Sequence, residues 1–247
     1  MTPTPHRRGI LLDIEGTTTP ISFVHEVLFP YARTHVRNYL ANFLDLPETR
    51  DKLTLLEQEH GLDVERDLHP PPLVNHSRHA EIDSMVSYVE WLIDRDRKSS
   101  GLKALQGRIW EQGYADGTLR APLFPDVLPA LQQWHQTGLR IAIFSSGSVL
   151  AQKLLFAHTE AGDVTKLLDF YFDTTTGPKM AAESYRVIAA RLELTTNELL
   201  FISDVAAELE AASNAGCQTR LCIRPGNPPQ PDQSHQLIFS FAELLRG

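Results

Sequence analysis

Two acidic side chains, Asp13 and Glu15, follow directly after a short apolar run, Ile10 to Leu12. Residues i and i+2 of an extended chain face the same side, so both carboxyl groups can address one phosphate group. Asp13 would attack phosphorus as the nucleophile, and Glu15 would protonate the departing oxygen and later activate water. An acid-x-acid triplet is weak evidence alone, because surface loops contain many of them.

A third acid, Asp204, also follows an apolar run, Leu199 to Ile202. In a doubly wound sheet of strand order 3-2-1-4-5, the carboxyl ends of the first and fourth strands meet where the order reverses, and ligands bind there. Asp13 and Asp204 would then lie close together, and like charges raise each other's pKa unless a cation is present. Oxygen ligands favour magnesium over zinc. The alternative is that each acid caps a separate helix, where Asp is common.

A site that transfers a phosphoryl group also needs donors for the non-bridging oxygens. Ser145 and Ser146 follow the run Arg140 to Phe144, and Gly147 then opens a predicted helix whose first amides would be free to bind an anion. Lys179 precedes another predicted helix, where a lysine can turn toward a phosphate. Two plainer interpretations stay open, because a serine pair often caps a helix and an isolated lysine is usually solvated.

Strands and helices alternate from about residue 125 onward, which argues for a parallel sheet covered by helices on both faces. Apolar residues keep helical spacing near residues 127–134, 187–192 and 209–212. The runs that we expect to form strands are Ile10 to Leu12, Arg140 to Phe144, Phe170 to Phe172, Leu199 to Ile202 and Thr219 to Ile223. The predicted fold class is therefore α/β, with a doubly wound parallel sheet.

The stretch from residue 18 to residue 119 has a different pattern. Its apolar residues keep helical spacing, as at Val24, Leu28 and Tyr31 and again at Ile82 and Met85. No convincing strand separates the predicted helices. We interpret the stretch as an inserted, all-helical cap, which gives an α/β catalytic core of residues 1–17 and 120–247 and a helical cap of residues 18–119.

Composition argues against several classes of function. The chain has 247 residues, 42% of them hydrophobic and 22% charged, and a net charge of −8. No basic stripe suggests a nucleic-acid partner. Neither a signal peptide nor a run of about 18 apolar residues is visible, so we expect no membrane association. Cys217 and Cys222 would point apart along one strand as free thiols, which suits a reducing compartment, and we expect a cytoplasmic protein.

The order Asp13, Ser145, Lys179 and Asp204 resembles the four motifs of the haloacid dehalogenase superfamily. Longer stretches are similar to the enolase-phosphatase family, also called acireductone synthase. These stretches span nearly the whole chain: Asp13 to Ser22, Asp94 to Lys98, Leu105 to Gly107, Phe144 to Ser148, Gly177 to Lys179, Ser203 to Val205 with Glu208 and Leu209, and Arg224 to Asn227.

The resemblance implies a haloacid dehalogenase-like core with a cap, and a magnesium-dependent phosphoric monoester hydrolase with enolase activity. The family acts in methionine salvage, a route of methionine biosynthesis. Its substrate is the small molecule 2,3-diketo-5-methylthiopentyl-1-phosphate, which it converts to the acireductone 1,2-dihydroxy-3-keto-5-methylthiopentene and phosphate. Enolisation comes first, and hydrolysis follows through an aspartyl-phosphate.

The resemblance also assigns roles to residues of this chain. Asp13 is the nucleophile and Glu15 the acid/base. One Mg²⁺ per subunit is held by Asp13, the backbone carbonyl of Glu15, and Asp204, and the substrate is held by Ser145, Ser146 and Lys179. Most superfamily phosphatases carry aspartate at the position of Glu15, and the extra methylene group would let its carboxyl reach a carbon-bound proton. Glu208 either supports the metal indirectly or is a salt-bridged surface residue.

Other functions remain as alternatives. The nearest is a generic capped, magnesium-dependent phosphatase for another small phosphate ester. A dehalogenase is disfavoured because it needs no metal, whereas this chain retains Glu15 and Asp204. A phosphoacceptor signalling module also forms an aspartyl-phosphate on a doubly wound sheet, but such modules are far shorter and lack a helical insertion. We expect the enzyme to act as a monomer.

Overall fold

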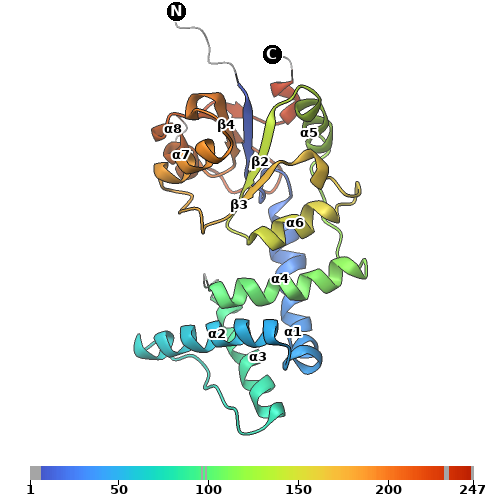
Figure 1. Cartoon of the computed structure of the whole chain (residues 1–247), viewed down its shortest axis with the longest axis vertical. Helices are drawn as coiled ribbons and strands as arrows, with labels where there is room; N and C mark the ends of the chain where they lie inside the picture. Colours follow the sequence, from blue (N-terminus) through green and yellow to red (C-terminus); the bar gives the residue numbers. More distant parts are fainter. Residues whose placement is uncertain (1–6, 96, 98, 231–233, 246–247) are drawn as a thin grey trace, which may run out of the picture. The chain divides into compact units, whose positions relative to one another are not determined.

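The structure is a computed structural model that describes residues 7–95, 97, 99–230 and 234–245. Asp96 and Lys98 of the family-like stretch lie outside the described residues, as does the extreme amino terminus that we searched for a signal peptide. The chain divides into two compact units, one of Met1–Val24 with Arg120–Gly247 and one of His25–Leu119 (Figure 1). Residues 18–24, which we expected to belong to the cap, fall in the first unit in this division. The N–H groups of Thr18 and Thr19 donate to the carbonyl of Ile14 at 2.9 and 3.0 Å, which ties the start of this stretch to the loop after β1.

The first unit is built on a six-stranded parallel sheet of order β3-β2-β1-β4-β5-β6. The predicted order 3-2-1-4-5 is confirmed, and all five expected strands are present. Strand β6 was not predicted, because two residues are too few to show a strand pattern. The strands are β1 (Gly9–Leu12), β2 (Arg140–Phe144), β3 (Phe170–Phe172), β4 (Leu199–Ser203), β5 (Gln218–Cys222) and β6 (Leu237–Ile238).

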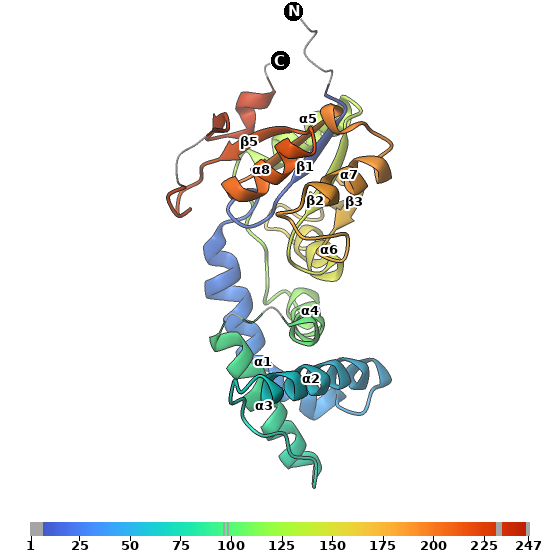
Figure 2. The same ribbon diagram turned by 90° about the vertical axis from the view of Figure 1, so that its left-hand side faces the viewer.

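Helices cover both faces of this sheet, as Figures 1 and 2 show. Helices α7 (Ala182–Arg191) and α8 (Ala206–Asn214) lie on one face, and α5 (Val127–Gln136) and α6 (Val149–Ala157) lie on the other. Short 3-10 turns at Thr165–Leu167, Thr196–Glu198 and Phe241–Leu244 connect or follow these elements. The α/β class and the doubly wound arrangement predicted from the sequence are confirmed.

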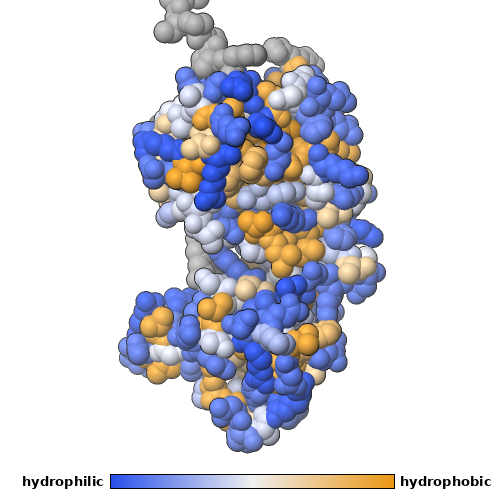
Figure 3. Space-filling model, viewed as in Figure 1, coloured by the Kyte–Doolittle hydropathy of each residue, from blue (hydrophilic) through white to orange (hydrophobic). Residues whose placement is uncertain are grey.

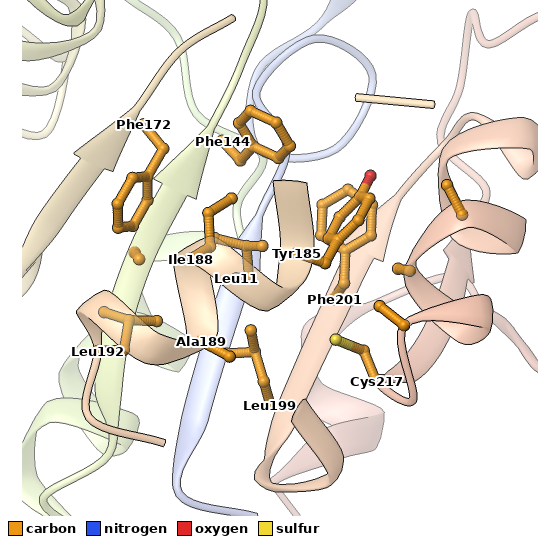
Figure 4. Close-up of a cluster of buried hydrophobic side chains, with 14 of the residues drawn as sticks. Leu11, Phe144, Phe172, Tyr185, Ile188, Ala189, Leu192, Leu199, Phe201 and Cys217 are labelled. Carbon is orange, nitrogen blue, oxygen red and sulfur yellow. The ribbon is translucent and has the colours of Figure 1, made fainter. Parts of the chain in front are cut away.

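A hydrophobic cluster packs α7 and α8 against the sheet. Tyr185 is fully buried, with its ring 5.6 Å from that of Phe144 and 5.1 Å from that of Phe201. Aromatic side chains bury about 150–250 Å² each and dominate the energetics of such cores. Figure 4 shows Tyr185, Ile188 and Ala189 of α7, with Leu192 at the end of that helix, over Leu11, Phe144, Leu199 and Phe201 of the strands. Cys217 joins the cluster, and both Cys217 and Cys222 are buried free thiols.

The second unit is helical. A short π-helical segment, Phe23–Leu28, leads into α1 (Phe29–Phe43), which is followed by α2 (Pro47–Glu65), α3 (Arg78–Asp94) and α4 (Ser100–Ala115). The described residues of this unit contain no strand, as expected. Helix α2 was not predicted, because only scattered positions such as Leu53 and Leu56 are apolar and buried. It packs closely on α4, where a Cβ atom at Gly101 would lie 2.8 Å from Cγ of Leu56.

Hydrophilic residues cover most of the face seen in Figure 3, with smaller hydrophobic patches on both units. No helix among the described residues combines the length and the apolar composition that a membrane crossing requires.

Candidate active site

The pairing of β1 with β4 brings the first loop of the chain to Asp204. Leu12 lies opposite Ile202 in the parallel register, and the N–H of Asp13 donates to the carbonyl of Ile202 at 3.0 Å. Both acids are buried, with exposed fractions of 5% for Asp13 and 4% for Asp204. The loop then passes against Asp204, because a Cβ at position 16 would overlap Oδ2 of that residue. Only glycine fits there, and it also adopts φ +70°.

Backbone and hydroxyl hydrogen bonds hold the loop that carries Glu15. The hydroxyl of Thr18 donates to the carbonyls of Ile14 at 3.1 Å and Asp13 at 3.3 Å, and the N–H of Gly16 donates to the carbonyl of Thr19 at 2.8 Å. Glu15 itself is partly buried. This tight turn gives the acid-x-acid stretch a defined shape at the carboxyl end of β1.

Lys179 lies beside the predicted nucleophile. Its Nζ forms an ion pair with Asp13 and another, of 2.7 Å, with Oε2 of Glu208. Burial alone would lower the pKa of Lys179, but the charges of Asp13 and Glu208 outweigh burial and raise it. The hydroxyl of Tyr185 donates to the backbone carbonyl of Lys179 at 2.7 Å. Because Tyr185 is part of the hydrophobic cluster, this bond fixes the backbone of Lys179 relative to the core. Lys179 therefore stays a cation inside the site.

Glu208 is not a surface residue, which removes one of the two roles left open for it. It lies in the first turn of α8, is buried, and accepts a hydrogen bond of 3.0 Å from the hydroxyl of Ser203. Burial, followed by the charge of Asp13, raises its pKa. Lys179 therefore pairs with both Asp13 and Glu208.

The electrostatics around Asp204 suit a divalent cation. Burial, followed by the charges of Asp13 and Glu208, raises the pKa of Asp204 to about 7. Acids that repel one another in this way are held ionised when a cation lies between them. Within the described ranges, no three His, Cys, Asp or Glu side chains are grouped closely enough to form a metal site by themselves. A cation here would thus need backbone oxygen or water in addition to the carboxylates, as Mg²⁺ commonly does.

Ser145 and Ser146 follow β2 at the same edge of the sheet. Ser145 is buried, and its N–H donates to the carbonyl of Phe172 at 3.2 Å, while Ser146 is exposed. Leu12, the last residue of β1, lies opposite Ile143 of β2, and Ser145 comes two residues after Ile143. Nζ of Lys179 lies 5.9 Å from the ring centroid of Phe144, the residue before Ser145. The sheet therefore gathers Asp13, Ser145, Lys179 and Asp204 at one edge.

The expectation of free amides after Ser146 needs correction. Helix α6 begins at Val149 rather than at Gly147, with Ser148 as its N-cap. The N–H of Val149 donates to Asp173 at 3.2 Å, and that of Ala151 donates to the hydroxyl of Ser148 at 3.3 Å. The first amides of a helix have no partner within the helix itself. Here the carboxylate of Asp173 and the hydroxyl of Ser148 already accept hydrogen bonds from two of them.

Two residues of the site have no role in the sequence interpretation. The amide of Asn227 donates to the carbonyl of Gly16 at 2.9 Å, and Nε of Arg224 donates to the carbonyl of Thr17 at 3.2 Å. Arg224 is held in turn by Asp126, at 2.9 Å for both of its terminal nitrogens. Both residues belong to the stretch from position 224 to position 227 that is similar to the enolase-phosphatase family. The sequence around them does not indicate that their side chains contact the loop after β1.

The chain is similar in sequence to a known family and to several named proteins. The sequence model of the haloacid dehalogenase-like hydrolase family matches residues 8–216. A Synechococcus elongatus protein named "Enolase-phosphatase E1" is 53% identical, over 95% of this chain and 96% of its own, and one from Drosophila grimshawi is 43% identical, over 95% and 94%. A Vitis vinifera protein, named "Probable bifunctional methylthioribulose-1-phosphate dehydratase/enolase-phosphatase E1 1", is 44% identical over 97% of this chain and 47% of its own.

Solved structures show the same fold. The UTR4 protein from Saccharomyces cerevisiae is 34% identical, with a TM-score of 0.74 over 95% of this chain and 98% of its own. CbbY from Rhodobacter sphaeroides matches at 17% identity with a TM-score of 0.58 over 96% of each chain, which is a likeness of fold alone.

Proposed function

The chain belongs to the haloacid dehalogenase-like hydrolases and, among them, to the enolase-phosphatases, and from this premise we propose that its substrate is 2,3-diketo-5-methylthiopentyl-1-phosphate. The products are the acireductone 1,2-dihydroxy-3-keto-5-methylthiopentene and phosphate. The grapevine relative supports this choice, because its name joins an enolase-phosphatase to a methylthioribulose-1-phosphate dehydratase. Loss of water from that sugar phosphate gives the diketone phosphate.

Asp13 is the nucleophile of the hydrolytic step in this proposal. The observation that carries it is the buried ion pair between Asp13 and Lys179 at the carboxyl edge of the sheet. The pair places a buried positive charge directly beside the carboxylate that would attack phosphorus. Lys179, Ser145 and Ser146 hold the non-bridging oxygens of the phosphate, and the aspartyl-phosphate that forms on Asp13 is then hydrolysed.

Glu15 handles protons in both reactions. In the first, it removes a proton from the carbon next to a carbonyl group, and in the second it protonates the departing oxygen and then activates water. The turn made by Thr18 and Gly16 supports this role, since it keeps the carboxyl-bearing backbone beside Asp13. One carboxyl group can serve both steps because the phosphate ester and the acidic C–H share a carbon atom.

One Mg²⁺ per chain fits the residues present. Asp13, Asp204 and the backbone carbonyl of Glu15 would hold it, and the raised pKa of Asp204 is the feature that a cation would reverse. When bound, the ion supplies positive charge to the phosphate oxygens. We further propose that the second unit is the cap that provides specificity for the methylthio group, and that the enzyme works as a monomer in the cytoplasm.

The test supplies the diketone phosphate with Mg²⁺ and follows the ultraviolet absorbance of the enol together with phosphate release. Both signals are expected, and replacing Asp13 with asparagine should abolish phosphate release. Glu15→Asp should impair enolisation more than hydrolysis, because the shorter side chain withdraws the carboxyl from the carbon-bound proton. Phosphate release from generic esters without an enol signal would instead support the generic phosphatase. Equal loss of both steps in Glu15→Asp would contradict the role of Glu15.

A further inference from the structure

A cavity lies at the edge of the sheet opposite to the candidate active site. Its volume is about 1070 Å³, and its wall includes the residues that open the strands, such as Arg140 of β2 and Gln218 of β5. Arg8, which precedes β1, and Leu194, which precedes β4, also line it. Because the strands are parallel, their amino and carboxyl ends lie at opposite edges. The cavity is therefore separate from Asp13 and Asp204.

Arginines dominate the charge of this wall, although the chain as a whole carries −8. Arg8 pairs with Glu198 at 3.2 Å, and Arg140 pairs with Asp169 at 3.4 Å. Arg7 and Arg220, both partly buried, pair with no acid among the residues that the structure describes.

Three N–H donors in the wall are buried without an acceptor. They are Nε of Arg7, Nε of Arg220 and Nε1 of Trp134. Arg220 makes one hydrogen bond, of 2.7 Å, from a terminal nitrogen to the carbonyl of Thr219. Buried polar groups without partners cost free energy, and native proteins contain few of them. These three nitrogen atoms are themselves buried, so a ligand in the cavity would meet the terminal guanidinium nitrogens of Arg7 and Arg220, which line the wall and are only partly buried.

Arg7 and Arg220 also repel each other. Burial, followed by the charge of Arg220, lowers the pKa of Arg7, and burial lowers the pKa of Arg220. The acids in the wall do not relieve this repulsion through any ion pair among the described residues. One of them, Glu243, instead accepts backbone hydrogen bonds from Phe239 and Ser240, at 2.8 and 3.0 Å.

We propose that this cavity binds a small organic phosphate, with Arg7 and Arg220 as the residues that hold the phosphate group. Guanidinium groups match phosphate oxygens in a two-point geometry and stay charged, so two of them balance one phosphate dianion. The volume is far larger than a phosphate alone needs and is of the size that holds drug-like molecules. Apolar wall residues that keep some exposed surface, Leu139, Leu244 and Leu245, are available to the organic part of the ligand.

The test measures thermal unfolding of the full chain with increasing AMP, in EDTA and without Mg²⁺. The wild type should melt at higher temperature as AMP rises, as mass action requires. In the double variant Arg7→Gln/Arg220→Gln the apparent affinity should fall about tenfold or more, because two charged donors are lost. Arg191→Gln, which removes an exposed arginine outside the cavity, is the matched control. Lys179→Gln, which removes a phosphate contact of the active site, should keep the response.

A second measurement separates a binding site from a structural pair. Without AMP, Arg220→Gln should melt at a higher temperature than the wild type, since it relieves the repulsion between two partly buried cations. A lower melting temperature for Arg220→Gln would overturn the proposal. So would an AMP response in the double variant equal to that of the wild type, or no response in the wild type at all.

Discussion

Lys179 is the cation that lets three buried acids share one small region. It pairs directly with Asp13 and Glu208, and its charge also lowers the pKa of Asp204 against the larger effects of burial and of Asp13. Burying the lysine's charge costs free energy, because the ammonium group loses its contact with water. The chain retains it, and that is understandable if the lysine holds the nucleophile and the phosphate together.

Replacing Lys179 with methionine should lower both stability and activity. Removing one partner of a buried ion pair typically costs about 3–5 kcal/mol, because the remaining charge is left without compensation. If Lys179 holds the phosphate as proposed, its loss should also lower kcat about 100-fold or more. Urea unfolding and phosphate-release kinetics measure the two effects. The exposed Lys166→Met is the control, and an unchanged free energy of unfolding for Lys179→Met would contradict this account of the pair.

Asn227 holds the loop after Asp13 from a distant part of the sequence. Asn227→Ala leaves the carbonyl of Gly16 without its 2.9 Å donor, so the turn that carries Glu15 should loosen. We expect a loss of about 1–2 kcal/mol in stability and a fall in kcat with little change in KM. Asn214→Ala, at the exposed end of α8, should change neither. A rise in KM at constant kcat would assign Asn227 to substrate binding instead.

The site residues that could be predicted from the sequence are those that parallel strand pairing brings together. Asp13 and Asp204 each follow a run of buried residues, and parallel strands bring such ends together whatever covers the faces. Glu208 could not be placed, because its approach to Lys179 depends on how α7 and α8 dock side by side. Asn227 could not be placed either, since its partner is a backbone carbonyl more than two hundred positions away.

At the scale of elements, α7 links the hydrophobic core to the site. Tyr185 is buried among aromatic rings and uses its hydroxyl to hold the backbone of Lys179. The helix itself was predictable from its apolar spacing. Helix α2 and strand β6 were not, because α2 has few apolar positions and β6 is two residues long. Their positions follow from the elements packed against them rather than from their own sequences.

Tyr185→Phe tests this link. It deletes a hydroxyl whose acceptor is buried, so we expect a loss of about 1–3 kcal/mol in the free energy of unfolding, together with a lower kcat as Lys179 becomes less well held. Tyr171→Phe is a matched control, because the hydroxyl of Tyr171 is buried without a partner. That variant should be neutral or slightly more stable. Equal effects in the two variants, measured by urea unfolding, would show that the hydrogen bond to Lys179 contributes nothing.

At the scale of the whole molecule, Asp126 holds together parts of the first unit that are far apart in sequence. Its carboxylate pairs with Arg224 at 2.9 Å and accepts the N–H of Phe241 at 2.6 Å and the hydroxyl of Ser240 at 3.2 Å. Arg224 in turn donates to Thr17 in the first loop. One carboxylate therefore connects the segment before α5, the loop after β1 and the carboxyl-terminal turn.

This connection should make the stability of the enzyme sensitive to acid. Burial would raise the pKa of Asp126, but the hydrogen bonds from Arg224 and Phe241 outweigh it, and the pKa in the folded protein lies below the ordinary value. A depressed carboxyl pKa gives stability that is complete above the unfolded-state pKa, near 4, and is lost as the pH falls through the folded-state pKa. Asp126→Asn should lose about 3 kcal/mol at pH 7, because the buried Arg224 loses the carboxylate that pairs with it. From pH 5 to pH 3 its stability should fall less than that of the wild type, as urea unfolding at each pH would measure. Parallel curves for the two proteins over that range would mean that Asp126 is not a source of the acid sensitivity.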